Sequence, residues 1–193
     1  MIRELVSIKR PAAGLVSAFV GALAVFISFS APASAQRKPA TPAPADPAKP
    51  ALVGQFGDWG AFATPQSKAR TCYALSQPKT RAPANLTRDP AYIFVSHRPA
   101  ERVRNEIAII MGFDVKPDSK PVAEIGDEEF ELVAKGPNLW LRNAPDEAKF
   151  IAAMRKGARL TLKARSMRNN LTTDTYSLSG ITQALDRALK ECP

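Results

Sequence analysis

The sequence is poor in the side chains on which most catalytic and metal sites depend. Its 193 residues include only two cysteines and one histidine. Two cysteines and one distant histidine do not fill the tetrahedral shell of a zinc site, so no metal is expected. The chain has no Gly-x-Ser-x-Gly nucleophile turn, no phosphate-binding P-loop and no dinucleotide-binding Gly-x-Gly-x-x-Gly motif. These absences argue against the common hydrolase, nucleotide-binding and dinucleotide-binding classes, and no cofactor is expected.

The single histidine, His97, lies at the end of a predicted strand. A Ser–His–acid enzyme would have to use it, but no nucleophile pattern accompanies it. A run of acids at residues 127–131 has no calcium-loop spacing, and alternation places Glu129 and Glu131 on one solvated strand face. We therefore predict no catalytic residue, and an enzyme built around His97 is the weakest alternative.

Acidic side chains are outnumbered, with 18 acids against 27 basic residues and a net charge of +9. This excess is too small for a dedicated nucleic-acid binder, which concentrates basic residues more densely. It suits a protein that works near an anionic lipid, polysaccharide or host surface. We therefore expect an anionic envelope or host-surface component as partner, and no nucleic acid.

The first 35 residues follow the order of a secretory signal peptide. A basic start precedes an uncharged, mostly apolar run over residues 11–31, and Ala33-Ser34-Ala35 matches the pattern that a signal peptidase cleaves. We predict a signal peptide over residues 1–35, cut between Ala35 and Gln36. The apolar run is also close to the length of a membrane span, about 20 residues, so an uncleaved anchor is the alternative. After cleavage no stable membrane span is expected.

Bulky apolar side chains are missing from residues 36–51, which hold five prolines and five alanines in sixteen residues. Such a segment buries too little apolar surface to offset the entropy of ordering, so a disordered, polyproline-like linker is predicted. Residues 52–193 remain, which is the length of one ordinary domain. The expected location is the periplasm, the cell envelope or the extracellular space.

The two cysteines, Cys72 and Cys192, are 120 positions apart in a chain expected to fold in an oxidising compartment. A disulfide between them would fix the C-terminal segment, which otherwise frays. We predict this intramolecular bond from the even cysteine count. A free thiol and an intermolecular bridge are the alternatives.

Residues 52–193 are dominated by short segments with the two-residue period of β-strands. A short strand is expected after the Gly57-Asp58 turn, and further strands are expected at residues 71–77, 91–97, 103–115, 121–126, 128–143, 158–167 and 172–179. A loop is expected at 79–90. A helix is expected within residues 143–157 and an amphipathic helix over 180–192. The pattern predicts a mainly β, immunoglobulin-like antiparallel β-sandwich with one short internal helix and a C-terminal helix. Trp59, Tyr73 and Trp140 are expected in its core or at the rim.

The densest run of one charge lies at residues 155–168, where six basic residues occur without an acid. Strand alternation places Arg159, Lys163 and Arg165 on one face, and Arg168 follows them in the chain. We define these four residues as the basic stripe and predict that it contacts an anionic partner. The alternative is a solvated outer face that discourages edge-to-edge pairing of sheets.

Two motifs at opposite ends of the domain give the sequence a family resemblance. Phe56-Gly57-Asp58-Trp59 precedes the strand at residues 71–77, and Ser177-Leu178-Ser179-Gly180 leads into the C-terminal helix. In this order and spacing they resemble the invasion-associated locus B family of exported Gram-negative proteins, over Val53 to Cys192. Family members often carry further cysteines near the first motif and in mid-domain, which this chain lacks.

The resemblance implies a periplasmic or surface-associated β-sandwich without known catalytic activity. We therefore expect a non-enzymatic exported protein that acts by surface contacts in the periplasm or cell envelope, with host-cell interaction as the role that the family name implies. The alternative is a housekeeping envelope protein, structural or stress-related, without a host ligand. The resemblance supplies no ligand-binding residues and no oligomeric state.

Overall fold

The computed structural model describes residues 49–65, 69–143 and 145–193. Within these ranges the chain forms eleven strands and three helical segments. The strands are β1 (Ala51–Phe56), β2 (Trp59–Ala63), β3 (Cys72–Ser76), β4 (Thr80–Ala82), β5 (Tyr92–Arg98), β6 (Val103–Ile110), β7 (Val122–Ile125), β8 (Glu128–Lys135), β9 (Asn138–Leu141), β10 (Arg159–Arg165) and β11 (Leu171–Ser177). The helices are η1 (Pro99–Glu101), α1 (Asp146–Lys156) and α2 (Ile181–Glu191).

The strands form two packed layers that are joined through one bent strand. The strand order is β1-β2-β3-β5-β6-β9-β8-β7-β10-β11-β4, and every pairing between neighbours is antiparallel where the register is given. The first half of β8, from Glu128 to Glu131, pairs with β7, and its second half, from Leu132 to Lys135, pairs with β9. Strands that change layer in this way make the corner of a sandwich. We call the layer of β1, β2, β3, β5, β6 and β9 the first layer, and that of β7, β10, β11 and β4 the second layer.

Strand alternation places one side of each layer in a common core. In the first layer Ala61, Ala74, Val95 and Ile107 follow one another across four paired strands, and all four are buried. On β10 of the second layer, the alternate residues Leu160, Leu162 and Ala164 are buried in the same core. A two-residue period with one apolar side is what a half-buried antiparallel strand requires. The predicted mainly β antiparallel sandwich with two α-helices is confirmed, although β8 joins its layers where an immunoglobulin domain has two separate sheets.

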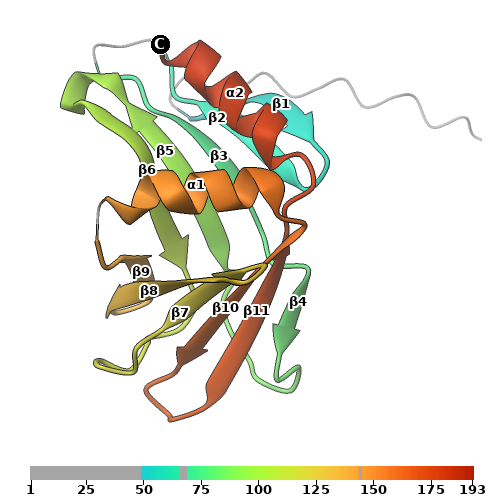
Figure 1. The fold of residues 1–193 in the computed structure, drawn as a ribbon, viewed down its shortest axis with the longest axis vertical. Helices are drawn as coiled ribbons and strands as arrows, with labels where there is room; N and C mark the ends of the chain where they lie inside the picture. The colour runs from blue at the N-terminus through green and yellow to red at the C-terminus, as the bar shows by residue number, and fades with distance from the viewer. Residues whose placement is uncertain (1–48, 66–68, 144) are drawn as a thin grey trace, which may run out of the picture. The chain divides into compact units, whose positions relative to one another are not determined.

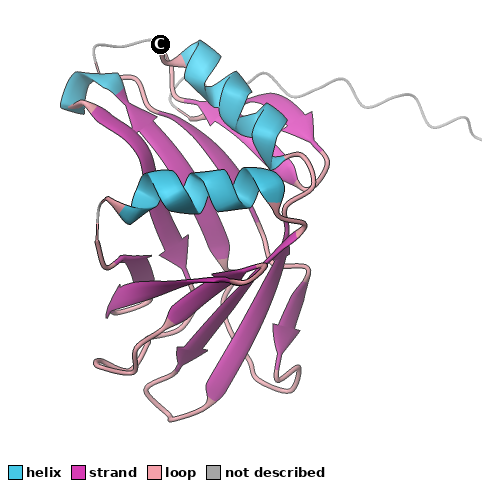
Figure 2. Cartoon of the chain, viewed as in Figure 1, coloured by secondary structure: helices cyan, strands magenta, loops and turns pink. Residues whose placement is uncertain are grey.

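Both α-helices pack on the inner side of the first layer (Figure 1). Helix α2 contacts β1, β2, β3 and β5, and α1 contacts β6, β8 and α2. The buried side chains of α2 repeat at helical spacing, and α1 places Phe150 edge-to-face against Phe130 of β8, with 4.9 Å between ring centroids. Acids open α1 and basic residues close it, which suits the helix dipole. The two helices thus close the core from one side (Figure 2).

The structure corrects two details of the sequence interpretation. The predicted loop at residues 79–90 contains the short edge strand β4, which pairs Arg81 with Asp174 of β11. Strand β1 begins at Ala51, the last residue of the predicted linker. The signal peptide, the cut between Ala35 and Gln36 and most of the linker lie outside the described residues. Within the described part of the chain, no helix has the length and apolar character needed to cross a membrane.

Candidate functional site

The two motifs that carry the family resemblance lie in contact. The indole N–H of Trp59 donates to the carbonyl oxygen of Ser177 at 2.9 Å, and the amide of Asp58 donates to the carbonyl oxygen of Ser179 at 3.1 Å. Gly180 has φ +90°, and a Cβ there would collide with the carbonyl oxygen of Phe56. Only glycine accepts both this conformation and this approach. The first turn of the domain and the start of α2 are therefore built as one junction.

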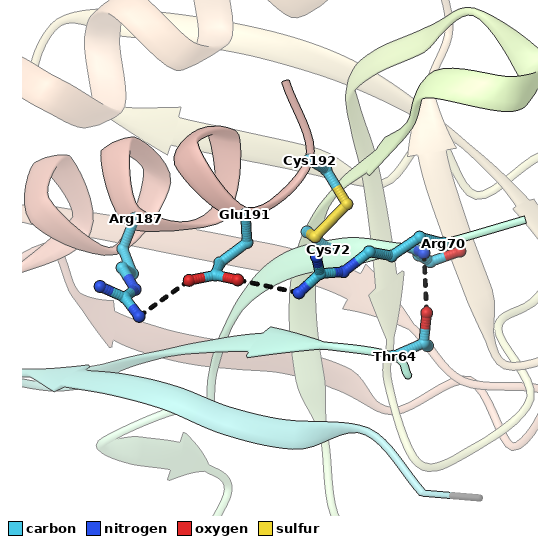
Figure 3. The surroundings of a disulfide bond; sticks show 7 residues. Thr64, Arg70, Cys72, Arg187, Glu191 and Cys192 are labelled. Atoms are coloured by element: carbon cyan, nitrogen blue, oxygen red, sulfur yellow. Dashed lines mark hydrogen bonds and ion pairs between the residues drawn. A yellow bond between two sulfur atoms is a disulfide. The ribbon is translucent and has the colours of Figure 1, made fainter. Parts of the chain in front are cut away.

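Cys72 and Cys192 form the disulfide that the cysteine count predicts (Figure 3). Their Cα atoms are 5.9 Å apart across a sequence separation of 120. The Glu191 carboxylate beside them accepts from Arg70 and from Arg187, each at 2.8 Å. The bond and this ion-pair network hold the end of α2 to β3, so the C-terminus is fixed rather than frayed.

His97 lies on β5, beside Cys72 of the neighbouring strand β3, and its side chain is closed to solvent. It pairs in register with Cys72 and is 1% exposed. Its Nδ1 accepts a hydrogen bond from the amide of Asn105 at 3.3 Å, so Nε2 carries the proton of the neutral ring. Burial, followed by the charge of Arg104, holds the pKa of His97 below its ordinary value. A general base must reach a substrate proton, and the position of His97 offers no such access.

Strand register places Arg159, Lys163 and Arg165 of the basic stripe on one face of β10, whereas Arg168 lies in the turn after the strand. The four residues do not have the same surroundings. Lys163 donates to Glu124 of β7 at 2.6 Å, and Arg165 donates to the carbonyl oxygen of Asn169 at 2.9 Å. Arg159 is exposed at the start of β10, and Arg168 is exposed in the turn that follows its end. Because Arg165 lies six positions after Arg159 along the strand, about 20 Å lies between them. The basic stripe therefore consists of two separate exposed arginines with two engaged side chains between them.

Each exposed arginine borders a cleft. Arg159 lines a cleft of about 500 Å³ together with Lys79 and a group of hydroxyl side chains: Thr80, Thr161, Thr175 and Ser177. Arg168 lines another cleft, also of about 500 Å³, with Asn85, Thr87 and Arg88. A cleft with two cations and several hydroxyl groups can bind an anionic group by charge and hydrogen bonding together. We call the first of these the Arg159 cleft.

One charged cluster could not be predicted from the sequence. Asp174 of β11 is fully buried, and its carboxylate accepts from Arg81 at 3.0 Å and from Arg88 at 3.2 Å. Arg81 also donates to the carbonyl oxygens of Asp89 and Met111, and Arg88 donates to that of Pro83. Burial raises the pKa of Asp174, while the two guanidinium groups oppose the rise. The cluster ties the segment after β4 to the second layer and serves the fold.

Three comparisons place the chain among known proteins. A family model described as "Invasion associated locus B (IalB) protein" matches residues 59–189. No curated protein matches the chain. The crystal structure of invasion associated protein B from Bartonella henselae matches with a TM-score of 0.50 and 14% sequence identity, covering 72% of this chain and 97% of that one. At 14% identity the structural match shows a similar fold and nothing about function. The family match spans most of the domain, and the chain belongs to the invasion associated locus B family.

Proposed function

We propose that the chain is an exported protein that works in the periplasm or cell envelope by non-catalytic contact with an anionic partner. Three features support export: the signal-peptide pattern of residues 1–35, the Pro/Ala-rich linker and the Cys72–Cys192 bond. Disulfides form and persist in oxidising compartments, which include the bacterial periplasm.

The single observation that supports the contact is the Arg159 cleft. It joins the Arg159 guanidinium and the Lys79 ammonium to four hydroxyl groups. The ammonium of Lys79 is 2.7 Å from Asp58, but its side chain is 57% exposed and remains open to a ligand. A phosphate or sulfate group on a glycan or lipid matches this chemistry, because it accepts charge-assisted hydrogen bonds from arginine and lysine.

Binding to two defined probes tests the contact. The exported protein is applied to immobilised heparin, a sulfated glycan, and to vesicles containing phosphatidylglycerol, at increasing salt. We expect binding that weakens with salt, because exposed charges are screened. Arg159→Glu with Lys79→Glu removes the two cations of the cleft and should lower the eluting salt concentration strongly.

A matched control separates the cleft from the overall charge. Arg142→Glu with Lys149→Glu makes the same change in net charge at two exposed residues, which lie in exposed ion pairs with Glu131 and Glu128. The proposal requires the cleft pair to weaken binding much more than the control pair. Equal effects would mean that net charge alone drives retention.

Wild-type protein that binds neither probe would instead favour the housekeeping envelope role. The pairing of Lys163 with Glu124 is consistent with that second reading, because it neutralises the middle of the basic stripe. Export is tested separately, by the intact mass of the protein from the periplasmic fraction. A chain that begins at Gln36 and resists alkylation without reductant supports cleavage and an oxidised pair, whereas a retained N-terminus would indicate an anchor.

A further inference from the structure

The outer side of the first layer is an apolar surface. The outward positions of β2, β3 and β5 carry Gly60, Phe62, Tyr73, Leu75, Tyr92, Phe94 and Ser96. The surface continues onto β1 at one margin and onto β6, β9 and β8 at the other, with Leu52, Ala108, Ile110, Trp140 and Val133. The polar outward positions of these marginal strands are Gln55, Glu106, Asn138 and Lys135. Leu52 is 54% exposed and Val133 is 38% exposed, while the aromatic and aliphatic side chains between them are partly buried and Gly60 and Ser96 are buried. We call this surface the apolar face.

The second layer shows what a solvated outer side looks like in the same molecule. Its outward positions on β10 and β11 hold Arg159, Thr161, Lys163, Arg165, Thr173, Thr175 and Ser177, with Leu171 as the one bulky apolar side chain among them. Hydroxyl and charged groups of this kind are normal where a sheet faces water. The apolar face has aromatic and aliphatic side chains in the equivalent places. Since a contiguous apolar patch on a sheet marks an interaction surface, the two layers have different tasks.

The aromatic side chains of the apolar face are held by one another. Phe62 stacks on Tyr73 with 5.3 Å between ring centroids and 12° between ring planes. Phe94 then contacts Tyr73 at 5.7 Å and Tyr92 at 6.1 Å. Rings fixed in this way lose little further side-chain entropy when a partner covers them. The surface is therefore ready for docking without rearrangement.

Neither α-helix covers the apolar face. Helix α2 buries its apolar stripe against the inner side of β1, β2 and β3, and α1 packs against β6 and β8 (Figure 2). The inward residues of these strands, such as Ala74, Val95 and Ile107, belong to the buried core. Within the described residues, the outer side of the first layer is thus left to a partner.

We propose that the apolar face packs against the apolar face of a second copy of the chain. The size of the surface fits a weak, reversible dimer. Seven strands from β1 to β8 at about 4.8 Å spacing and three outward rows give a face of about 29 Å by 20 Å. Two such faces bury on the order of 1,000 Å², which lies at the lower end of specific interfaces. We therefore expect a dissociation constant in the micromolar range.

Charge favours a second copy over a charged partner. The chain carries +9, of which the predicted signal peptide holds +2 (three basic residues and one acid), so two copies of the exported protein, at +7 each, repel wherever their basic surfaces approach. The outward positions of β2 and β3, and those of β5 as far as Ser96, are uncharged, and Arg98 at the end of β5 is ion-paired with Glu106 of β6. Here two copies meet without net repulsion. An acidic or basic partner would find no unpaired counter-charge among these residues, because Arg98 is already paired with Glu106. Two sheets that pack face to face about 10 Å apart are a standard arrangement of β-proteins.

Sedimentation equilibrium of the exported protein, from about 1 to 200 µM, tests the dimer. We expect the mean mass to rise from that of one chain toward that of two. Leu52→Glu with Val133→Glu places charges at both margins of the apolar face and should raise the dissociation constant at least tenfold. Met167→Glu with Leu171→Glu is the matched control, because these side chains are 60% and 56% exposed and Leu171 lies outward on the second layer. The control should dimerise like the wild type.

The two tryptophans add a reporter that does not depend on mass. Trp59 is fully buried, whereas Trp140 lies on the apolar face, so quenching by acrylamide reports mainly on Trp140. Quenching should decrease as the wild type dimerises, and should not decrease in the Leu52→Glu/Val133→Glu variant. Near-ultraviolet circular dichroism verifies that each variant is folded.

Three results would overturn the proposal: a wild-type protein that stays monomeric at 200 µM, a face variant that dimerises normally, or equal weakening by both variant pairs. Salt separates this proposal from that of the Arg159 cleft. Anion binding must weaken as salt rises, whereas association through an uncharged face must not. Either proposal can therefore fail without the other.

Discussion

The indole N–H of Trp59 and the carbonyl oxygen of Ser177 are joined by a 2.9 Å hydrogen bond across 118 residues of sequence. Trp59 opens β2 in the first layer, and Ser177 ends β11 in the second. The bond therefore joins the two layers at the point where the chain turns into α2. The family match begins at Trp59 and includes Ser177. The junction explains why an aromatic-Gly-Asp-Trp turn and a Ser-Leu-x-Gly turn occur together.

Gly180→Ala should destabilise the domain strongly. At φ +90° any side chain is strained, and here the new Cβ would also meet the carbonyl oxygen of Phe56. Backbone strain alone costs about 1–3 kcal/mol, and the collision adds to it because both partners are backbone. Urea denaturation should give a loss of free energy of unfolding above about 3 kcal/mol.

Gly126→Ala is the matched control for strain without collision. Gly126 has φ +60°, and a Cβ there has no neighbour within 4 Å. Its cost should stay near 1 kcal/mol, the usual penalty for a left-handed residue. Equal losses for the two variants would show that the approach of Gly180 to Phe56 is not important for stability.

Replacing both cysteines by serine should destabilise the domain and loosen its C-terminus first. Opening a loop of 120 residues costs up to about 5 kcal/mol in the chain-entropy model. Limited proteolysis followed by mass spectrometry should find the first new cuts in α2, whose end is held by this bond and by Arg70. A variant in which the first cuts fall in the second layer would contradict this order of unfolding.

The sequence predicts those parts of the fold that depend on local pattern. The alternation of Leu160, Leu162 and Ala164 with charged residues set the register of β10, and the helical stripe of α2 set its buried side. The disulfide could be predicted from the even number of cysteines and from the oxidising compartment in which the chain is expected to fold. In each case the signal lies in neighbouring residues or in composition.

The parts that could not be predicted depend on distant partners. Strand β4 has three residues and forms because Arg81 lies beside Asp174 of β11, which no local pattern shows. The apolar face was hidden for another reason. Strand β5 carries bulky apolar residues on both sides, with Ile93 inward and Phe94 outward, so its period does not tell core from surface. Only the register shows that Tyr73 and Trp140 face outward.

The stability of the domain should fall as the pH is lowered from 7.5 to 5. Burial holds the pKa of His97 below its ordinary value of 6.5, so the unfolded chain binds the proton more readily than the folded one. The contribution of neutral His97 is complete above pH 6.5 and is lost as the pH falls toward the lowered pKa. Since His97 is the only histidine, His97→Gln should remove this slope in urea denaturation. A wild-type stability that is flat over this range would count against a buried, neutral ring.

Asp174→Asn should cost far more than the loss of an exposed ion pair. The change leaves the buried Arg88 side chain, which is 6% exposed, and its neighbour Arg81 without a counter-charge. Breaking a buried pair from one side costs about 3–5 kcal/mol. Glu124→Gln breaks the exposed contact with Lys163, and its cost should stay below about 1 kcal/mol. Urea denaturation measures both losses, and proteolysis should show faster cleavage between Pro83 and Pro90 in the Asp174 variant alone. If the two variants lose equal stability, the cluster is not what holds this segment to β11, and the hydrogen bonds from Arg81 and Arg88 to the backbone are sufficient by themselves.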